Sequence, residues 1–225
     1  MQIIPVLDLM GGLVVRGHLG DRASYRPIVT PLSDTPDPVA VAQGLQSLGP
    51  FSAIYVADLD AIEGRGVQAG VLDALSGAFP GTDFWIDAGV ADADGARALL
   101  ARERTVVVIG SETLLSVDVL EALAGEDRWA LSLDYRGTSF VGPKGVLERP
   151  DLWPARVIAM TLAKVGSGAG PDFARLAEVR ALAGPERQVF AAGGVRDGAD
   201  LARLEAEGIS GALVASALHD GRLRR

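Results

Sequence analysis

The sequence predicts an α/β fold, a single (β/α)8 TIM barrel over residues 1–225. Eight short apolar runs rich in β-branched residues alternate with Ala- and Leu-rich stretches of helical period. These runs do not alternate polar with apolar residues, as expected for parallel strands covered on both faces. The 225 residues leave about 28 for each of eight units, close to a minimal βα unit. No linker divides the chain.

Each strand is expected where an apolar run ends at a polar or small residue. In chain order the expected strands are 3–8, 53–58, 83–87, 105–110, 129–134, 156–161, 188–192 and 211–215. The expected helices are 38–48, 67–75, 94–100, 117–123, 174–182, 199–207 and a C-terminal stretch. Gly49 and Gly125 follow two of these helices, and a glycine just past the last turn is a common helix stop.

An internal repeat indicates two duplicated half-barrels, over approximately residues 1–115 and 116–225. The stretch 87–92 matches 192–197 at an offset of 105 residues (197 − 92). At the same offset Leu99 matches Leu204, and Ser111 matches Ser216. Coincidence between two amphipathic helices is the alternative, although the matches include a loop glycine and a strand end.

Composition excludes several classes of function. There are 21 Lys and Arg against 29 Asp and Glu, a net charge of −8, which argues against a nucleic-acid or anionic-membrane partner. The absence of cysteine excludes disulfides, thiolate nucleophiles and cysteine metal sites. The two histidines, His18 and His219, are too few for a histidine-rich metal site. We therefore expect no metal.

No apolar run approaches the roughly 18 residues that span a bilayer. Residues 1–5 lack the basic-then-apolar pattern of a secretory signal. We expect a cytoplasmic protein whose partner is a small phosphorylated substrate, with the oligomeric state left open.

Candidate catalytic residues lie where strands end, because barrels build their active sites on the βα loops. Asp8 and Asp134 close strands in opposite halves, so they can face each other. Two carboxyl groups placed in this way can work as a general acid and a general base if their environments separate their pKa values. The alternative for either is a loop cap or an ion pair with Arg16, Arg136 or Lys164. Two other aspartates, Asp58 and Asp60, are better explained as partners of loop amides.

A phosphate site is expected after the seventh and eighth strands. Gly193, Gly194 and Arg196 follow one strand, and Ala215 with Ser216 follows the next. Bare backbone amides at this edge of a barrel commonly bind phosphate, and an arginine adds a charge-assisted contact. A pair of glycines alone also serves ordinary tight turns.

The matching loops of the first half are poorer phosphate sites. Asp87 stands where the partner loop has Ala192, Ala91 stands opposite Arg196, and Glu112 follows Ser111. These acids would repel phosphate and could instead hold a hydroxyl, an amine or a cation. The loop 20–27, which contains Arg22, is either a lid over an anionic substrate or a solvated basic loop. The substrate-binding candidates are Arg16, Arg22, Asp58, Asp87 and Ser111.

The chain resembles the HisA/HisF family, which includes phosphoribosylformimino-aminoimidazole-carboxamide ribotide (ProFAR) isomerase and imidazole glycerol phosphate synthase. The similar stretches are 3–9 with Gly12 and 15–16, 56–61 with 63–64, 132–134, Thr161, 166–171, 192–195 and 216–218. The resemblance implies a duplicated barrel that binds two phosphates and an Amadori rearrangement of an aminoaldose, without metal or cofactor. It implies Asp8 as general base, with Asp134 and Thr161 at other active-site strand ends and Gly168 in a phosphate-binding loop.

Departures from the family pattern leave the reaction open. The isomerase is expected to carry Asp-Gly-Thr where Val165-Gly166-Ser167 stands, and Gly-Gly-Gly-Ile-Arg where 87–91 stands. The stretches 25–28, 57–62 and 110–114 resemble a HisA-related subgroup of methanogens and methylotrophs. We therefore expect an enzyme acting on a metabolite with one phosphate, in tetrahydromethanopterin or methanofuran biosynthesis. Lys164 is a candidate for the missing acid or for a Schiff base. ProFAR isomerisation and a non-catalytic ligand-binding paralogue are the alternatives.

Overall fold

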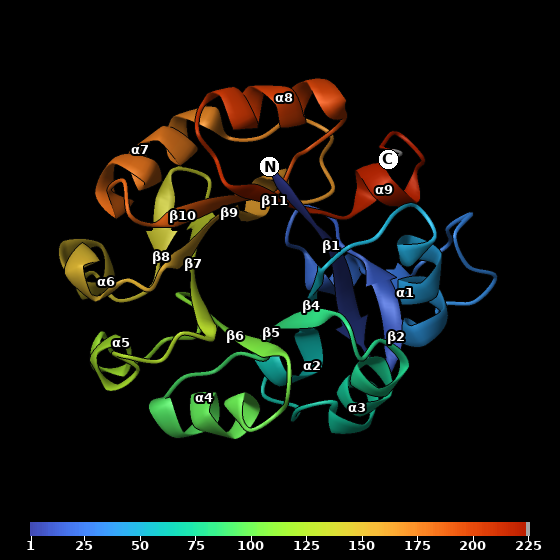
Figure 1. The fold of residues 1–225 in the computed structure, drawn as a ribbon, viewed down its shortest axis with the longest axis horizontal. Coiled ribbons are helices and arrows are strands. Elements are labelled where there is room, and N and C mark those ends of the chain that lie inside the picture. The colour runs from blue at the N-terminus through green and yellow to red at the C-terminus, as the bar shows by residue number, and fades with distance from the viewer. Residues whose placement is uncertain (224–225) are drawn as a thin grey trace.

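Eight parallel strands close into a barrel in the computed structural model, which describes residues 1–223 (Figure 1). They are β1 (Gln2–Met10), β4 (Ala53–Asp58), β5 (Asp83–Asp87), β6 (Thr105–Gly110), β7 (Trp129–Arg136), β9 (Arg156–Thr161), β10 (Gln188–Ala192) and β11 (Gly211–Val214). The ring closes because β1 pairs in parallel with both β4 and β11. The predicted (β/α)8 TIM barrel is confirmed.

Three further strands were not expected from the sequence. β2 (Leu13–Arg16) and β3 (Arg26–Pro27) extend the sheet antiparallel beyond β1, and β8 (Ser139–Val141) pairs antiparallel with β7. Both β1 and β7 run past their predicted ends because each continues into one of these hairpins. The hairpins therefore stand at the edge of the barrel where Asp8 and Asp134 lie.

Helices surround the strands on the outside of the barrel (Figure 1). They are α1 (Pro38–Gln46), α2 (Leu59–Ile62), α3 (Ala69–Ala78), α4 (Ala93–Leu100), α5 (Asp118–Ala122), α6 (Gly145–Glu148), α7 (Phe173–Ala183), α8 (Gly198–Ala206) and α9 (Ser216–His219). Single 3-10 turns occur at η1 (Arg22–Ser24), η2 (Pro150–Leu152) and η3 (Leu162–Lys164). The sequence missed α2 and α6, which are single turns too short to show a period. No described helix has the length and apolar character to cross a bilayer.

The repeated motif places equivalent helix caps after the third and seventh barrel strands. The Asp92 carboxylate accepts the Gly95 N–H at 2.8 Å at the start of α4. Asp197 accepts the N–H groups of Ala199 and Asp200 at 3.0 and 3.1 Å at the start of α8. Aspartate is a favoured N-cap residue because its oxygen satisfies amides that lack a helical acceptor. The two repeat segments thus begin their helices with the same type of cap.

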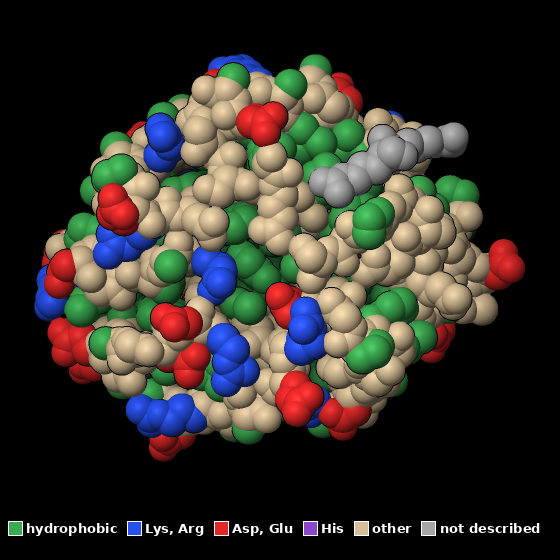
Figure 2. Space-filling model, viewed as in Figure 1, with side chains coloured by type: hydrophobic (Ala, Val, Ile, Leu, Met, Phe, Trp, Pro, Cys, Tyr) green, Lys and Arg blue, Asp and Glu red, His purple; other side chains and the backbone are tan. Residues whose placement is uncertain are grey.

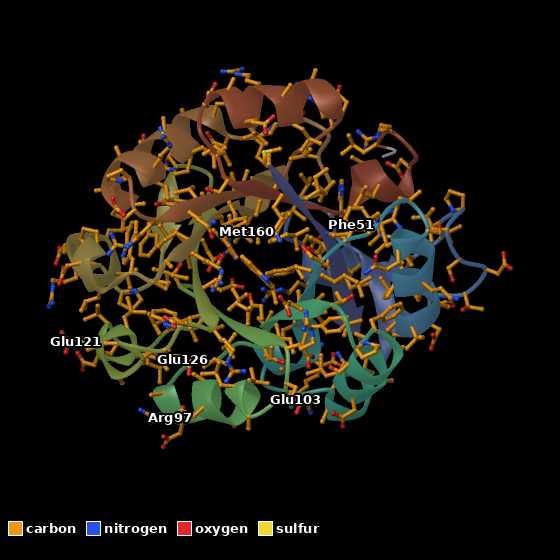
Figure 3. All side chains as sticks on the ribbon, viewed as in Figure 1. Phe51, Arg97, Glu103, Glu121, Glu126 and Met160 are labelled. Atoms are coloured by element: carbon orange, nitrogen blue, oxygen red, sulfur yellow. The ribbon has the colours of Figure 1, made fainter. Side chains whose placement is uncertain are left out.

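Two apolar clusters fill the molecule. The larger lies between strands and helices, and the smaller fills the barrel itself. In the smaller cluster the rings of Trp85 and Phe190 meet edge to face at 4.9 Å. Met160 packs against this cluster toward the middle of the barrel, whereas Arg97 and Glu121 lie on the outer helices (Figure 3). Packed side chains therefore fill the interior and separate the two ends of the barrel.

Strand register brings the inward-facing polar residues to the same end. Asp8 pairs with Ala57, which pairs with Asp87, so the two carboxylates stand in one row two strands apart. Asp134 pairs with Met160, which pairs with Ala192. Residues in such rows point to the same side of the sheet.

Candidate active site

A cavity of about 140 Å³ opens at the carboxyl ends of the barrel strands. Its wall includes Asp8, Arg22, Asp87, Glu112, Asp134, Gly168, Gly193, Gly194, Ala215 and Ser216. The face seen in Figure 2 carries Lys, Arg, Asp and Glu side chains close together over the middle of the barrel. The cavity thus collects residues from both halves of the chain.

Asp8 projects from β1 into this cavity. No group among residues 1–223 donates a hydrogen bond to its carboxylate. Burial raises the pKa of Asp8 to about 6, and the positive charge of Arg22 opposes this rise. A carboxylate with a raised pKa and no internal donor is available to take a proton from a bound molecule.

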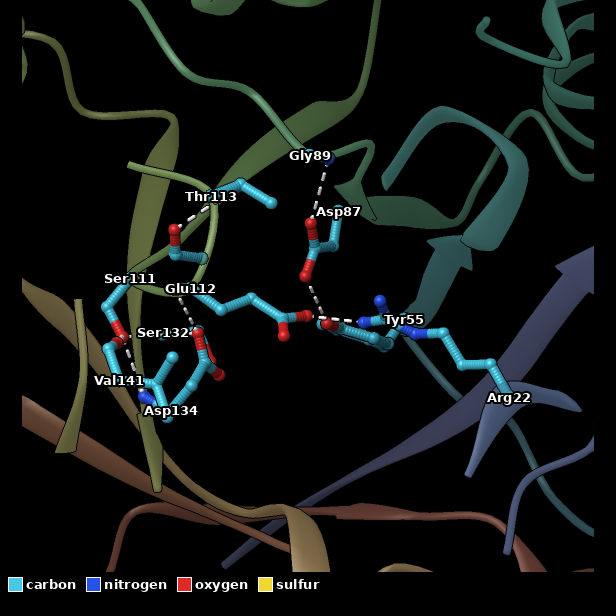
Figure 4. A network of polar contacts seen from close by, with 11 residues as sticks. Arg22, Tyr55, Asp87, Gly89, Ser111, Glu112, Thr113, Ser132, Asp134 and Val141 are labelled. Carbon is cyan, nitrogen blue, oxygen red and sulfur yellow. Dashed lines mark hydrogen bonds and ion pairs between the residues drawn. The ribbon is translucent and has the colours of Figure 1, made fainter. Parts of the chain in front are cut away.

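Asp134 is 4% exposed and is held by a network of hydrogen bonds (Figure 4). The Ser132 hydroxyl donates to Oδ1 at 2.8 Å, and the Glu112 N–H donates to Oδ2 at 3.1 Å. Burial and then the charge of Asp87 raise the pKa of Asp134 to about 7, against these two hydrogen bonds. Near neutral pH a substantial share of Asp134 is therefore protonated and can act as an acid.

Asp87 and Glu112 form the first-half side of the cavity. The Tyr55 hydroxyl donates to Asp87 Oδ2 at 3.0 Å, and the Gly89 N–H lies 3.2 Å from Oδ1. Burial raises the pKa of Asp87 to about 6. Glu112 reaches across the cavity to an ion pair with Arg22 (Figure 4). The positive charge of Arg22 therefore offsets the negative charge of these two acids.

The second-half side presents backbone amides instead. Within the described chain, no acceptor takes the N–H groups of Gly193, Gly194, Val195 or Ser216, and all four residues line the cavity. Positive φ angles of 94° and 89° at the two glycines turn these amides, as glycine permits. Free amides in a concave loop bind anions well.

The repeat allows a direct comparison of the two halves. Gly89 and Gly194 are equivalent at the 105-residue offset (194 − 89). The Gly89 N–H is taken by the carboxylate of Asp87, whereas residue 192 is an alanine and leaves the Gly194 N–H without an acceptor among residues 1–223. The two loops therefore have opposite electrostatic character.

Arg196 does not line the cavity. Its guanidinium donates to Asp200 from Nε at 2.9 Å and from Nη2 at 2.7 Å, and its backbone N–H donates to the same carboxylate at 2.9 Å. This pairing raises the pKa of Arg196. The structure thus gives Arg196 a place in fixing the loop, and direct contact with a phosphate would need it to leave Asp200.

Five other predicted site residues lie off the cavity wall. Arg16 pairs with Asp220 at 3.0 Å. Asp58 caps α2 and accepts hydrogen bonds from both the backbone N–H and the side-chain amide of Gln68. Both of its carboxylate oxygens therefore stabilise the loop after β4. Thr161 is buried beside Asp172, with 3.5 Å between their oxygens. The last two, Lys164 and Ser111, are not part of the wall, and Ser111 contacts Asp134.

The sequence did not single out Tyr55 or Ser132. Each lies on a strand, two positions before another residue that faces into the barrel. Tyr55 shares the inner face of β4 with Ala57, and Ser132 precedes Asp134 by two positions on β7. The period of two along a strand is the signal that would have found them. Across the described residues, no group of three or more His, Cys, Asp or Glu side chains could hold a metal ion.

Comparison with known proteins now gives the family. The model of the family described as "Histidine biosynthesis protein" matches residues 2–224. A ProFAR isomerase of Parasynechococcus marenigrum is 31% identical over 99% of this chain and 90% of its own length. The corresponding isomerase of Salinispora arenicola is also 31% identical, over 98% of this chain and 93% of its own length.

The chain belongs to the histidine biosynthesis protein family. This confirms the resemblance to the HisA/HisF family seen in the sequence. A methanogen member, a protein of Methanocaldococcus jannaschii named as uncharacterized, is 27% identical over 99% of this chain and 95% of its own length. The names of these three relatives do not support a place in tetrahydromethanopterin or methanofuran biosynthesis.

The departures from the family pattern border the cavity. Val165, which stands where the resemblance leads one to expect an acid, lines the wall near Asp8. Asp87, which begins the altered first-half loop, is also in the wall. Asp8 and Asp134 are both retained there. The cavity therefore keeps two buried aspartates although position 165 carries no carboxylate.

Proposed function

We propose that this protein is an isomerase that converts a phosphorylated aminoaldose into an aminoketose by acid–base catalysis, with ProFAR as substrate. The observation that carries the proposal is that Asp8 and Asp134 line one cavity with pKa values of about 6 and 7. Two carboxyl groups whose environments set different pKa values can serve as base and acid in the same reaction.

The residues fit the steps of an Amadori rearrangement. Asp134, while protonated, gives its proton to the ring oxygen as the bond from that oxygen to C1 breaks and the nitrogen forms a Schiff base. Asp8 then removes the proton from C2, which produces an enolamine. Return of a proton to C1 and loss of the proton from the C2 hydroxyl give the ketone. The sum is an isomerisation with no external oxidant or reductant.

The amide loop supports a phosphate at one end of the substrate. Gly193, Gly194, Val195 and Ser216 offer donors to a dianion without a competing carboxylate in the same loop. Arg222 also lines this cavity, where its guanidinium is paired with Asp220 at 3.0 Å. Binding of the phosphate here would hold the sugar in place over Asp8 and Asp134, which is how positioning lowers the barrier of the reaction.

Names of relatives support ProFAR as the substrate, because two family members at 31% identity carry the name of ProFAR isomerase. A specific observation favours a second candidate, an aminoaldose with one phosphate. The first-half side of the cavity holds Asp87 and Glu112, and the Gly89 amide is already occupied. A second phosphate would meet two carboxylates there, with Arg22 as the compensating charge.

The test is turnover of two substrates by the purified protein, ProFAR and an analogue without the phosphate at the imidazole end. Turnover of ProFAR that is lost in Asp8→Asn supports the main proposal. Turnover of the analogue alone supports the second candidate. Failure to turn over either one, by folded protein that still binds phosphate, rejects both and leaves a non-catalytic ligand-binding barrel.

A further inference from the structure

Ser111 is completely buried, and its hydroxyl oxygen has three polar neighbours (Figure 4). The carbonyl oxygen of Val141 lies at 2.7 Å, the backbone nitrogen of Asp134 at 2.9 Å, and Oδ2 of Asp134 at 3.2 Å. The Ser111 hydroxyl is thus in hydrogen-bonding contact with both the backbone and the carboxyl group of Asp134.

The directions of these hydrogen bonds follow from the groups involved. A serine hydroxyl has one proton to donate and two lone pairs that accept. The Val141 carbonyl can only accept, so it takes the hydroxyl proton over the shorter distance. The Asp134 N–H can only donate, so it occupies one lone pair. The second lone pair faces Asp134 Oδ2.

An ionised carboxylate cannot donate to that lone pair, whereas a protonated one can. We propose that Ser111 is a positioning residue whose hydroxyl oxygen accepts a hydrogen bond from Oδ2 of protonated Asp134, and which thereby favours the protonated form of this carboxyl group before substrate binds. The role as acid rests on the proposed function, but the preference of Ser111 for protonated Asp134 does not.

The chain around β8 is built so that this arrangement forms. Val141 is the residue of β8 that pairs with Asp134. Gly142 follows it with φ of 144°, and a Cβ there would lie 2.6 Å from the carbonyl oxygen of Ser111. Only glycine allows such an approach. The hairpin thereby brings the Val141 carbonyl within reach of the Ser111 hydroxyl, which donates its only proton to that carbonyl.

Ser132 acts on the same carboxyl group in the opposite sense. Its hydroxyl donates to Oδ1 at 2.8 Å, and a donor stabilises the ionised form. The chain therefore contains two buried serines around Asp134, one that accepts from it and one that donates to it. Replacing either serine by alanine removes one hydroxyl group. The two replacements should shift the pKa of Asp134 in opposite directions.

Other charged groups near Asp134 also influence its pKa, and they are the same in both serine variants. The titratable and charged groups around it are Tyr55 on β4, Asp87 on β5, Glu112 after β6, and Tyr135 and Arg136 on its own strand, with Arg22 paired to Glu112. Neither serine contacts Asp87, Tyr55 or Arg22 through a hydrogen bond in the described chain. Each substitution therefore leaves these charges in place.

The test is a carbon-13 NMR titration of the aspartate carboxyl groups, with Asp134 assigned by its absence in Asp134→Asn. Ser111→Ala is expected to lower the pKa of Asp134 by about one unit, the size of one hydrogen bond. Ser132→Ala is expected to raise it by a similar amount. Ser111→Thr, which keeps the hydroxyl, is expected to restore the wild-type value.

A pKa of Asp134 that rises or stays unchanged in Ser111→Ala would overturn the proposal, as would shifts of the same sign in both alanine variants. If Ser111→Ala does not fold, Ser111→Cys carries the same prediction because sulfur is a weak acceptor. The titration needs no substrate, so its result is independent of turnover. Where turnover is found, the alkaline limb of the rate profile should move with the pKa of Asp134.

Discussion

Arg22 forms an ion pair with Glu112 across the mouth of the barrel, although the two residues are 90 positions apart. The pair joins the loop after β2 to the loop after β6. Both side chains are mostly buried, with 27% and 19% exposed. Arg22 is thus the charge that offsets the acids of the first-half side, and the sequence could not show whether its loop was solvated.

Replacement of Arg22 should raise the pKa of the base. The positive charge of Arg22 lowers the pKa of Asp8 against the effect of burial. In Arg22→Gln this opposition is lost, so the acidic limb of kcat/KM should move to higher pH by about half a unit to one unit. The measurement is the pH dependence of kcat/KM. Arg22→Lys, which keeps the charge, should move it less, and equal shifts in both variants would contradict the argument.

Gly17 keeps space open for the carboxylate of Asp8. A Cβ at position 17 would lie 2.7 Å from Asp8 Oδ2 and 3.3 Å from Val165 Cγ1. Gly17→Ala should therefore displace the base and reduce kcat by roughly 10- to 100-fold without unfolding the protein. Gly70→Ala in α3, where a Cβ meets nothing within 4 Å, is the control and should leave kcat unchanged. Wild-type kcat in Gly17→Ala would show that the position of Asp8 is not critical.

The two repeat glycines make a matched pair for phosphate binding. Gly89 and Gly194 have φ of 63° and 89°, and an added Cβ would lie 2.6 Å and 2.3 Å from the nearest backbone atom. Both alanine variants are therefore strained to a similar extent. Only Gly194→Ala should weaken binding of inorganic phosphate, by about tenfold or more, because it distorts the loop with free amides. Calorimetric titration measures the affinity, and equal losses in the two variants would place phosphate elsewhere.

The buried carboxyl groups also make folding depend on pH. The pKa of Asp87 is about 6 in the folded protein, compared with 3.8 for the free side chain. The folded state therefore binds more protons than the unfolded chain between about pH 4 and 6, so stability is lost as pH rises through this window. For Asp87 the full loss is expected to be about 3 kcal/mol, because each pKa unit corresponds to about 1.4 kcal/mol.

Urea denaturation at pH 5 and pH 8 measures this dependence. Asp87→Asn should lose less stability between the two conditions than the wild type does. His219, whose pKa burial lowers to about 4, contributes with the opposite sign below about pH 6.5, but it is present in both proteins and cancels in the comparison. Identical pH dependence in the two proteins would mean that Asp87 is not protonated on folding.

Most of the barrel could be predicted because local sequence and fold agree. The run 105–110 is aliphatic enough to be a strand buried on both faces, and β6 occupies these residues. Single-turn helices such as α2 have no such pattern, since four residues show no period. The hairpin of β2 with β3 was missed because its pairing to β1 depends on the chain reversal at 11–12 and on long-range contacts.

The site was harder to predict than the fold. Strand ends indicated Asp8, Asp87 and Asp134 as candidates, and all three line one cavity because the carboxyl ends of barrel strands converge. The roles of Arg196 and Ser111 could not be inferred, because each depends on a partner that only the fold brings close. Arg196 is held by Asp200, one helical turn away, and Ser111 is held by a hairpin 30 residues further along the chain.

The most direct test of the account is the rate of ProFAR isomerisation by the wild-type protein, Asp8→Asn and Asp134→Asn. The affinity of each protein for inorganic phosphate is measured alongside, to show that the variants still bind this anion as the wild type does. The account predicts turnover by the wild type and a fall in kcat of roughly 10²- to 10⁴-fold in each variant, the usual contribution of a positioned acid or base. Wild-type kcat in Asp8→Asn, or no turnover by folded wild-type protein, would contradict it.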